Sequence, residues 1–136
     1  DCLYRGALAG DGAPRIVEGD LQTIMAGLAC GEPNTISWDI LRNHATAFVS
    51  CPDWVTARGM RTLGAPEKGD PRVISGESGA VTTGLVETLM LDPEYAELKE
   101  LIGLDKTSSV LCFSTEGDTD PDQYRRIVWE GEYPTC

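Results

Sequence analysis

The stretch RVISGESGAVTTGLVETLM, residues 72–90, joins a short apolar segment to an amphipathic segment through a glycine-bearing turn. Residues 72–75 (RVIS) have the composition of a short buried strand, and the GES that follows favours a turn. Val81, Leu85 and Leu89 are spaced four residues apart, so they share one face of a helix. The sequence therefore predicts a strand, a turn and a helix in succession.

The same unit occurs twice more along the chain. Residues 47–50 (AFVS) precede a predicted helix over 52–64, which has a proline near its first turn and a glycine near its end. Residues 110–114 (VLCFS) precede a predicted helix over 122–128. Short apolar strands that alternate with amphipathic helices indicate a parallel sheet with helices on both faces. The predicted fold class is therefore α/β.

Outside these units, the sequence is less periodic. Residues 1–20 are rich in Gly, Asp and Ala, and we expect a loop or an incomplete edge there. Residues 37–45 are expected to form a helix with Ser37 as its N-cap, and residues 92–103 a helix that begins at Asp-Pro-Glu. The buried stripe of the second helix is expected to be Tyr95, Leu98 and Ile102. Residues 21–136 then form one α/β part of a domain.

Charge and cysteine content restrict the classes of partner. The chain of 136 residues carries 22 acidic and 11 basic side chains, a formal net charge of -11. Such a surface repels phosphate backbones and anionic lipid, which argues against nucleic-acid and membrane partners. Five cysteines, an odd number with no C-x-x-C pair, favour a reducing, cytoplasmic location. The first residue is Asp rather than Met, so we expect a piece of a longer protein.

Each predicted strand ends in a serine, namely Ser50, Ser75 and Ser114. Right-handed crossovers bring the carboxyl ends of parallel strands to one edge of the sheet, and open α/β sheets bind ligands there. Serine also caps helices, so a binding site and a set of helix caps both explain the pattern. On the first interpretation, Ser114 and Glu77 face one crevice that suits a small planar ligand.

A serine hydrolase would need the nucleophile-elbow motif G-x-S-x-G, and residues 76–80 (GESGA) come near to it. Ala80 stands where the motif needs its last glycine. The single histidine, His44, precedes Ser78, whereas that fold places its histidine after the serine. A solvated or packed helix residue explains His44 better than a catalytic base does.

Asp118, Asp120 and Asp122 have the D-x-D-x-D spacing of a calcium loop. Gln123 stands where that loop requires glycine, and Trp129 where it requires glutamate. Asp120 or Asp122 as the N-cap of the last predicted helix explains the spacing better. The sequence also lacks a Walker lysine loop and a G-x-G-x-x-G motif. It therefore predicts no metal site and no phosphate-cradling motif.

Four longer motifs resemble a known family. They are TIMAGLACGEPN (23–34), FVSCPDWVTARGMRTLG (48–64), VISGESGAV (73–81) and FSTEGDTDPDQYRRIVWEG (113–131). Together, over essentially all of residues 1–136, they resemble the C-terminal portion of the diaminopropionate ammonia-lyase family, which belongs to the tryptophan-synthase-β-like (fold type II) pyridoxal 5'-phosphate enzymes. The resemblance implies that fold, a homodimer, and α,β-elimination of an amino-acid substrate, 2,3-diaminopropionate, to pyruvate and ammonia.

The resemblance also implies which residues bind the cofactor. The loop after the last strand supplies a hydroxyl to the pyridine nitrogen, which is Ser114, or Thr115 in place of the family's usual glycine. Glu77 matches an acidic residue at the ring side of the cofactor, and Gly27 matches a glycine that passes close to the ring. A carboxylate partner would keep the nitrogen protonated and the ring a strong electron sink, whereas a neutral hydroxyl suits elimination.

The family's Schiff-base lysine has no match here. Lys68 lies in a Gly/Pro loop, Lys99 in the acidic face of a predicted helix, and Lys106 before the third strand. We therefore expect no catalytic residue in this segment, an inactive isolated chain, and self-association through an exposed apolar edge. Two alternatives remain: a non-catalytic small-ligand-binding or regulatory module, and a serine hydrolase that uses Ser78.

Overall fold

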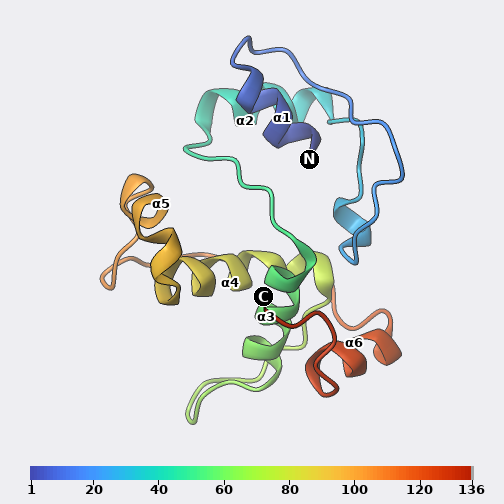
Figure 1. Ribbon diagram of the computed structural model, residues 1–136, viewed down its shortest axis with the longest axis vertical. Coiled ribbons are helices and arrows are strands. Elements are labelled where there is room, and N and C mark those ends of the chain that lie inside the picture. Colours follow the sequence, from blue (N-terminus) through green and yellow to red (C-terminus); the bar gives the residue numbers. More distant parts are fainter. Residues whose placement is uncertain (136) are drawn as a thin grey trace. The chain divides into compact units, whose positions relative to one another are not determined.

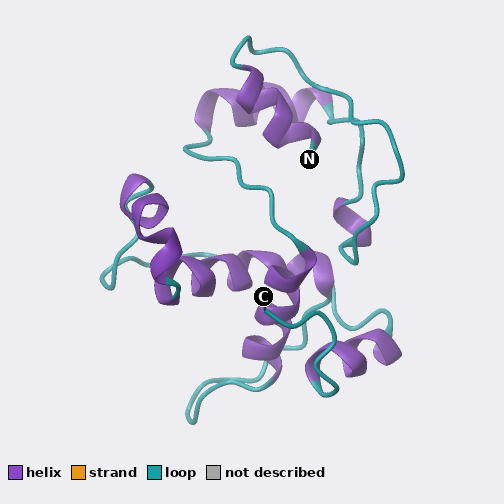
Figure 2. Ribbon diagram, in the orientation of Figure 1, coloured by secondary structure: helices purple, strands orange, loops and turns teal. Residues whose placement is uncertain are grey.

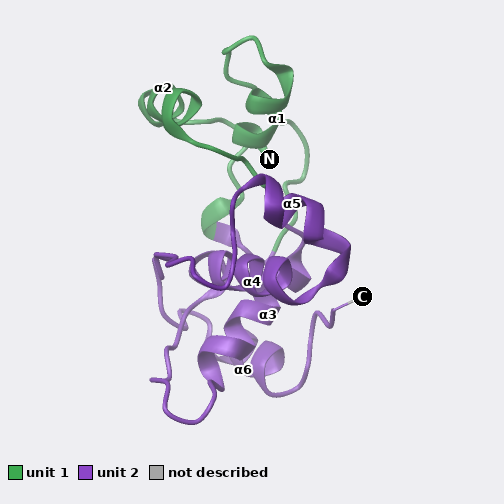
Figure 3. Cartoon of the chain, turned by 90° about the vertical axis from the view of Figure 1, so that its left-hand side faces the viewer, with its two compact units in different colours: residues 1–23, 27–50 green, residues 24–26, 51–136 purple. Residues whose placement is uncertain are grey.

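The computed structural model describes residues 1–135, which form helices joined by loops (Figure 1, Figure 2). Within that range no residue is in a strand, and no helix is both long and apolar enough to cross a membrane. The chain divides into two compact units (Figure 3). Unit 1 contains residues 1–23 and 27–50, and unit 2 contains residues 24–26 and 51–136.

Unit 1 packs around Trp38, which lies on helix α2 (Thr35–His44) and is 4% exposed. Helix α1 (Cys2–Ala9) places Gly6 against the indole, where a Cβ atom would lie 2.7 Å from Cη2 of the ring. The indole N–H donates a hydrogen bond to the Gly12 carbonyl oxygen at 3.0 Å. The Phe48 ring lies 6.0 Å from the indole, centroid to centroid. The large ring is thus buried with its one polar group satisfied.

Two predictions for unit 1 are wrong. The expected loop over residues 1–20 contains helix α1, which ends at Gly10 with a left-handed φ of 69°. Alanine, leucine and arginine are good helix formers. The sequence of this segment has weak apolar periodicity, and its packing against Trp38 stabilises the helix instead. The N-cap of α2 is Asn34 rather than Ser37, because Asn34 Oδ1 accepts a hydrogen bond from the Ser37 N–H at 2.9 Å.

Unit 2 contains the helices that the sequence predicts for it. They are α3 (Asp53–Gly64), α4 (Glu77–Leu91), η2 (Pro93–Tyr95), α5 (Ala96–Leu101) and α6 (Pro121–Val128). The 3₁₀ turn η2 and helix α5 together occupy the region predicted as one helix over residues 92–103. Every predicted stripe residue of that helix is half-buried: Tyr95, Leu98 and Ile102. The local signals for helices in this unit are therefore confirmed.

Helices α3 and α4 cross with their backbones in direct contact. A Cβ atom on Gly59 would collide with the Ala80 carbonyl oxygen, and one on Gly84 with the Val55 carbonyl oxygen. Only glycine permits backbones to approach this closely. Helix α6 packs against α3 beside this crossing. The buried cluster of unit 2 comprises Ala57, Met60, Ala80, Tyr124 and Ile127.

The predicted parallel sheet is not confirmed, since within residues 1–135 the segments 47–50, 72–75 and 110–114 are not strands. A strand is held by a ladder of backbone hydrogen bonds to a neighbouring strand. Val73 instead donates its N–H to the carbonyl oxygen of Leu63, near the end of α3, at 2.9 Å. Apolar composition predicts where strands can form, but a strand also needs a partner.

Candidate functional site

Residues 75–79, which lead into α4 and form its first turn, meet the loop of residues 114–117, and we call these two segments the α4 junction. The Gly76 N–H donates to the Glu116 carbonyl oxygen at 3.0 Å, and the Ser78 N–H donates to Glu116 Oε1 at 3.1 Å. The first N–H groups of a helix have no partner inside it, and a carboxylate is favoured at that end by the helix dipole. Glu116 therefore fixes the loop after segment 110–114 onto the start of α4.

Two hydroxyl groups lie side by side in the α4 junction, because Ser114 Oγ is 2.8 Å from Ser75 Oγ. Ser75 is 0% exposed, and its hydroxyl also lies 3.2 Å from the Gly76 carbonyl oxygen. Ser114 is exposed, and its hydroxyl lies 3.4 Å from the Glu116 carbonyl oxygen. The junction thus presents one hydroxyl at the surface and places a fully buried one behind it.

The close approach of residues 75–79 to the 114–117 loop depends on glycine. A Cβ atom on Gly79 would lie 2.7 Å from Ser75 Oγ and 2.9 Å from the Thr115 nitrogen. A Cβ atom on Gly76 would lie 2.7 Å from Cγ of Glu116. Any side chain at these two positions would push the two segments of the junction apart. The glycines of the SGESG turn therefore stand where the STEG loop packs on it.

Glu77 is the first residue of α4 and is 9% exposed. Its carbonyl oxygen accepts a hydrogen bond from the buried hydroxyl of Thr56 on α3. Burial, and to a smaller extent nearby acidic groups that include Glu77, raises the pKa of the Tyr133 hydroxyl. Glu77 follows Ser75 by two positions, and Ser75 touches Ser114. The structure therefore places the backbone of Glu77 two residues from the contact of Ser75 with Ser114.

The other two predicted cofactor-binding residues lie in different units. Thr115 is exposed and belongs to the α4 junction in unit 2. Gly27 belongs to unit 1 and lies in the 3₁₀ turn η1 (Ala26–Leu28), with its carbonyl oxygen 4.0 Å from the Cys30 sulfur. Of the four predicted residues, three thus share the junction, and Gly27 lies in the unit that contains α1 and α2.

The serines that end the three apolar segments have different surroundings. Ser75 and Ser114 meet in unit 2, whereas Ser50 belongs to unit 1 and donates its hydroxyl to Asp1 Oδ1 at 2.6 Å. The N-cap of α4 is Gly76, with no capping side-chain hydrogen bond, so Ser75 does not cap this helix. Asp120 caps α6, one of the two caps that the sequence left open.

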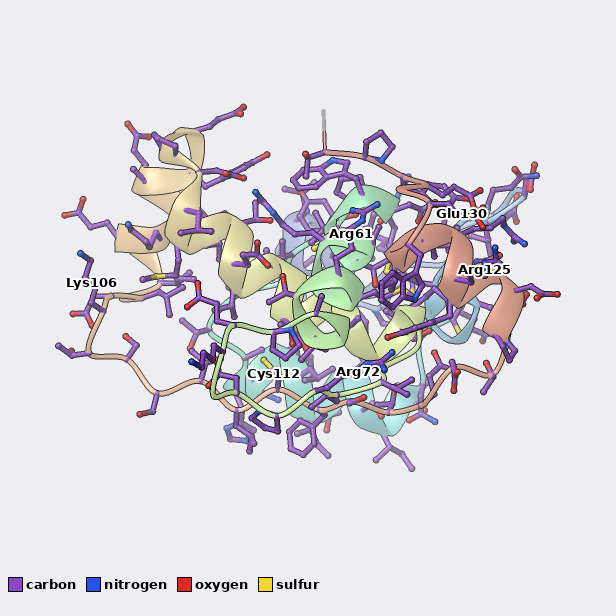
Figure 4. All side chains as sticks on the ribbon, turned by 90° about the horizontal axis from the view of Figure 1, so that it is seen from below. Arg61, Arg72, Lys106, Cys112, Arg125 and Glu130 are labelled. Carbon is purple, nitrogen blue, oxygen red and sulfur yellow. The ribbon has the colours of Figure 1, made fainter. Side chains whose placement is uncertain are left out.

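None of the three lysines belongs to the α4 junction. Lys106 is exposed on the loop that follows α5 (Figure 4). Lys68 is exposed in the loop between α3 and α4, and Lys99 lies on α5. Within the described part of the chain, no three His, Cys, Asp or Glu side chains gather as they would around a metal ion. The chemistry of the junction is therefore that of hydroxyls, backbone groups and carboxylates.

Sequence reasoning missed one residue of the junction, Glu116. Ser75 is among the three segment-ending serines that the sequence places at one candidate binding edge, whereas no role is predicted for Glu116 within the acidic loop. Glu116 follows the end of segment 110–114 by two positions, but only the structure shows that it faces the start of α4, where a carboxylate is favoured. The contact of Ser75 with Ser114 has no local signal, since it joins residues far apart in the sequence, and only the predicted sheet edge places the two serines together.

Comparison with solved structures shows that this chain is similar to part of an enzyme that uses pyridoxal phosphate (PLP). A structure that holds an aminoacrylate–PLP azomethine reaction intermediate matches 98% of this chain with a TM-score of 0.87 and 53% identity. A complex of the same enzyme with D-serine matches 100% of the chain, with a TM-score of 0.87 and 48% identity. That enzyme is diaminopropionate ammonia-lyase from Escherichia coli, and this chain covers 33% of it.

Curated sequences agree with the structures. Diaminopropionate ammonia-lyase of Escherichia coli K12 is 54% identical over 133 residues, which are 98% of this chain and 33% of the relative. The Salmonella typhimurium enzyme is 52% identical over 132 residues, which are 96% of this chain and 33% of the relative. No protein-family model matches the chain. The chain thus spans about a third of the length of these relatives and is homologous to that third. The resemblance seen in its sequence is confirmed.

Proposed function

We propose that these residues form the C-terminal portion of a PLP-dependent ammonia-lyase that converts 2,3-diaminopropionate to pyruvate and ammonia. The observation that carries this proposal is the match of 98% of the chain to diaminopropionate ammonia-lyase at 53% identity and a TM-score of 0.87. Because the chain corresponds to 33% of that enzyme, the activity is assigned to the longer protein and not to these residues alone.

The donor groups of the α4 junction fit the ring nitrogen of PLP. Ser114 offers a neutral hydroxyl at the surface, with Thr115 beside it. The nearby carboxylate of Glu116 is occupied, since its Oε1 accepts the N–H of Ser78. Bound PLP supplies an electron sink for charge that develops at the α-carbon of an amino acid. A hydroxyl rather than a carboxylate at the nitrogen limits that sink, which suits departure of a β leaving group. Glu77 contributes a buried acidic residue beside the same junction.

The remaining parts of the catalytic machinery are assigned to residues outside this chain. A PLP enzyme of this kind needs a lysine that holds the cofactor as a Schiff base. Lys68 and Lys106 are exposed in loops and Lys99 lies on α5, so none stands beside Ser114 in the junction. The isolated chain is therefore expected to be inactive.

The three apolar segments, 47–50, 72–75 and 110–114, have the exposed side chains expected of strands whose neighbours lie in other parts of the enzyme. Large apolar side chains in all three of them are exposed: Val49 is 41%, Val73 36%, Ile74 44%, Val110 49%, Leu111 79% and Phe113 71% exposed. Contiguous exposed apolar side chains usually mark an interaction surface. We propose that segments 47–50, 72–75 and 110–114 become strands of a parallel sheet when the rest of the enzyme supplies their neighbours.

The proposal extends to assembly and location. We propose a homodimer, because the family that the sequence resembles is dimeric. The four described cysteines are unpaired, as expected for a reducing compartment such as the cytoplasm: Cys2, Cys30, Cys51 and Cys112. Sedimentation of the longer enzyme measures the dimer directly, and a monomeric active enzyme would contradict it.

A chimera tests the proposed activity. This chain replaces the homologous third of the Escherichia coli enzyme, and pyruvate formation from 2,3-diaminopropionate is measured with added PLP. We expect the chimera to form pyruvate and this chain alone to form none. The unmodified Escherichia coli enzyme is the control for the assay.

Three outcomes separate the proposed function from its alternatives. A folded chimera that binds PLP but forms no pyruvate would refute the assigned reaction. Tight binding of an amino acid by this chain alone would favour the ligand-binding module. Labelling of Ser78 by a fluorophosphonate would favour the hydrolase.

A further inference from the structure

We infer that Ser75 is a positioning residue that frees the Ser114 hydroxyl to donate its proton to the ring nitrogen of PLP. The inference rests on the proposed function and deepens it, because it explains how a neutral hydroxyl is held at that nitrogen. It starts from the contact of 2.8 Å between the two oxygens and from the complete burial of Ser75.

The hydroxyls of Ser75 and Ser114 have only two protons between them to donate in hydrogen bonds. Each serine hydroxyl has one proton to donate and two lone pairs that accept. In this structure Ser75 donates toward the Gly76 carbonyl oxygen at 3.2 Å, and Ser114 donates toward Ser75. The Glu116 carbonyl oxygen, 3.4 Å from Ser114 Oγ, is a further acceptor. In this arrangement the only proton of Ser114 points inward.

A ring nitrogen that accepts from Ser114 changes this arrangement. Ser114 then directs its proton outward, and its inward lone pair needs a donor. Ser75 is the contact that can supply one, because the Glu116 carbonyl oxygen can only accept. A rotation of the Ser75 O–H from Gly76 to Ser114 Oγ exchanges a contact of 3.2 Å for one of 2.8 Å. No proton changes its oxygen, since both hydroxyls only rotate.

The packing of Ser75 makes it suitable for this role. Ser75 is 0% exposed, so bulk water does not compete for its proton. Gly79 leaves no spare room around it, since a Cβ atom there would lie 2.7 Å from Ser75 Oγ. Ser114, in contrast, is exposed and without Ser75 would rotate among water partners. Ser75 therefore fixes both the place and the hydrogen-bond direction of the hydroxyl that meets the nitrogen.

The test compares Ser75→Ala with Thr88→Val in the PLP-loaded chimera. Thr88 is a matched control, since it is a buried hydroxyl on α4 that accepts a hydrogen bond from Arg58 and is not part of the α4 junction. The readouts are PLP affinity and the ¹⁵N resonance of PLP labelled at its ring nitrogen. For S75A we expect about fivefold weaker PLP binding, as for one lost hydrogen bond, and a moved ¹⁵N resonance. For T88V we expect neither change.

A double-mutant cycle with Ser114→Ala completes the test. If Ser75 acts through Ser114, then adding S75A to S114A changes neither PLP affinity nor the ¹⁵N resonance further. An unmoved ¹⁵N resonance in S75A, or full additivity with S114A, would overturn the inference. In the isolated chain the urea midpoint losses of the two variants should be less than additive, and additive losses would also overturn it. An unsubstituted chimera that binds PLP but makes no pyruvate would refute the proposed reaction and leave this comparison measurable.

Discussion

Helix α6 and the apolar segment 110–114 are close in the sequence and differ in how much of their structure this chain completes. Ile127 on α6 is 0% exposed, within the cluster formed with α3 and α4, whereas Phe113 is 71% exposed. A helix satisfies its backbone within its own segment, but a strand needs hydrogen bonds from another segment. The difference shows that a helix signal can be realised within a third of the enzyme, while a strand signal also depends on the sheet's other members.

The largest expected effect comes from truncating these two side chains in turn. Ile127→Ala should destabilise the isolated chain by about 3 kcal/mol, because it leaves a cavity in the core of unit 2. Phe113→Ala should change its stability by less than about 0.5 kcal/mol, because that side chain is already exposed. Urea unfolding followed by circular dichroism measures both.

In the chimera, the two substitutions should become similar. If segment 110–114 is a buried strand there, Phe113→Ala should cost about 3 kcal/mol as well. Equal costs in the isolated chain, or a Phe113→Ala cost near zero in the chimera, would break the comparison between the two regions.

The sequence-based predictions are accurate for the helices and less accurate for the strands. Pro52 and the spacing of Val81, Leu85 and Leu89 are local signals, and they located α3 and α4 correctly. The meeting of Ser75 and Ser114 followed from placing two segment ends at one edge, although the sheet that would create that edge is not formed within residues 1–135.

The residues that sequence reasoning missed depend on contacts from distant segments. Helix α1 gains its packing from Trp38 of α2, and Asn34 rather than Ser37 caps α2. Glu116 is recognisable as a helix-capping residue only once the start of α4 is known to lie beside it. Local propensity therefore predicted most elements, while tertiary neighbours decided the caps, the first helix and the junction.

The next largest effect concerns the crossing that holds the helical region together. Gly84→Ala places a Cβ atom against the Val55 carbonyl oxygen of α3. Separating the two backbones should destabilise the isolated chain by about 2 kcal/mol. Gly117→Ala is the matched control, because no atom lies within 4 Å of the Cβ atom it adds. A loss for Gly84→Ala no larger than for Gly117→Ala would mean that the crossing adjusts freely.

A smaller, pH-dependent effect comes from the ion pair that joins α3 to the end of α4. Arg58 Nη1 lies 2.6 Å from Asp92 Oδ2, and this hydrogen bond lowers the pKa of Asp92 below its usual value. A carboxyl whose pKa is lower in the folded state stabilises the protein above its unfolded pKa of about 3.9, and this stabilisation is lost as the pH falls through the folded pKa.

Asp92→Asn tests the sign of this dependence. The variant should be less stable than the original chain at neutral pH, and the difference should shrink as the pH falls below about 4. Urea midpoints measured from pH 7 downward follow the difference. Asp118→Asn removes the same charge without touching Arg58, and is the control. A difference between D92N and the original chain that stays constant with pH would show that the ion pair does not stabilise the helical region.

The smallest expected effect is a gain, at the hydroxyl of Tyr124 on α6. Tyr124 is 5% exposed, and its hydroxyl has no hydrogen-bond partner among the described residues. The oxygen packs over Gly64, where a Cβ atom would lie 2.6 Å from it. A buried hydroxyl without a partner is costly, so Tyr124→Phe should leave stability unchanged or raise it by up to about 1 kcal/mol. Tyr4→Phe, at a position 38% exposed, should have no effect and serves as the control. A loss of stability in Tyr124→Phe would show that a buried water satisfies the hydroxyl, and the core beside α3 would then be less complete than its apolar packing indicates.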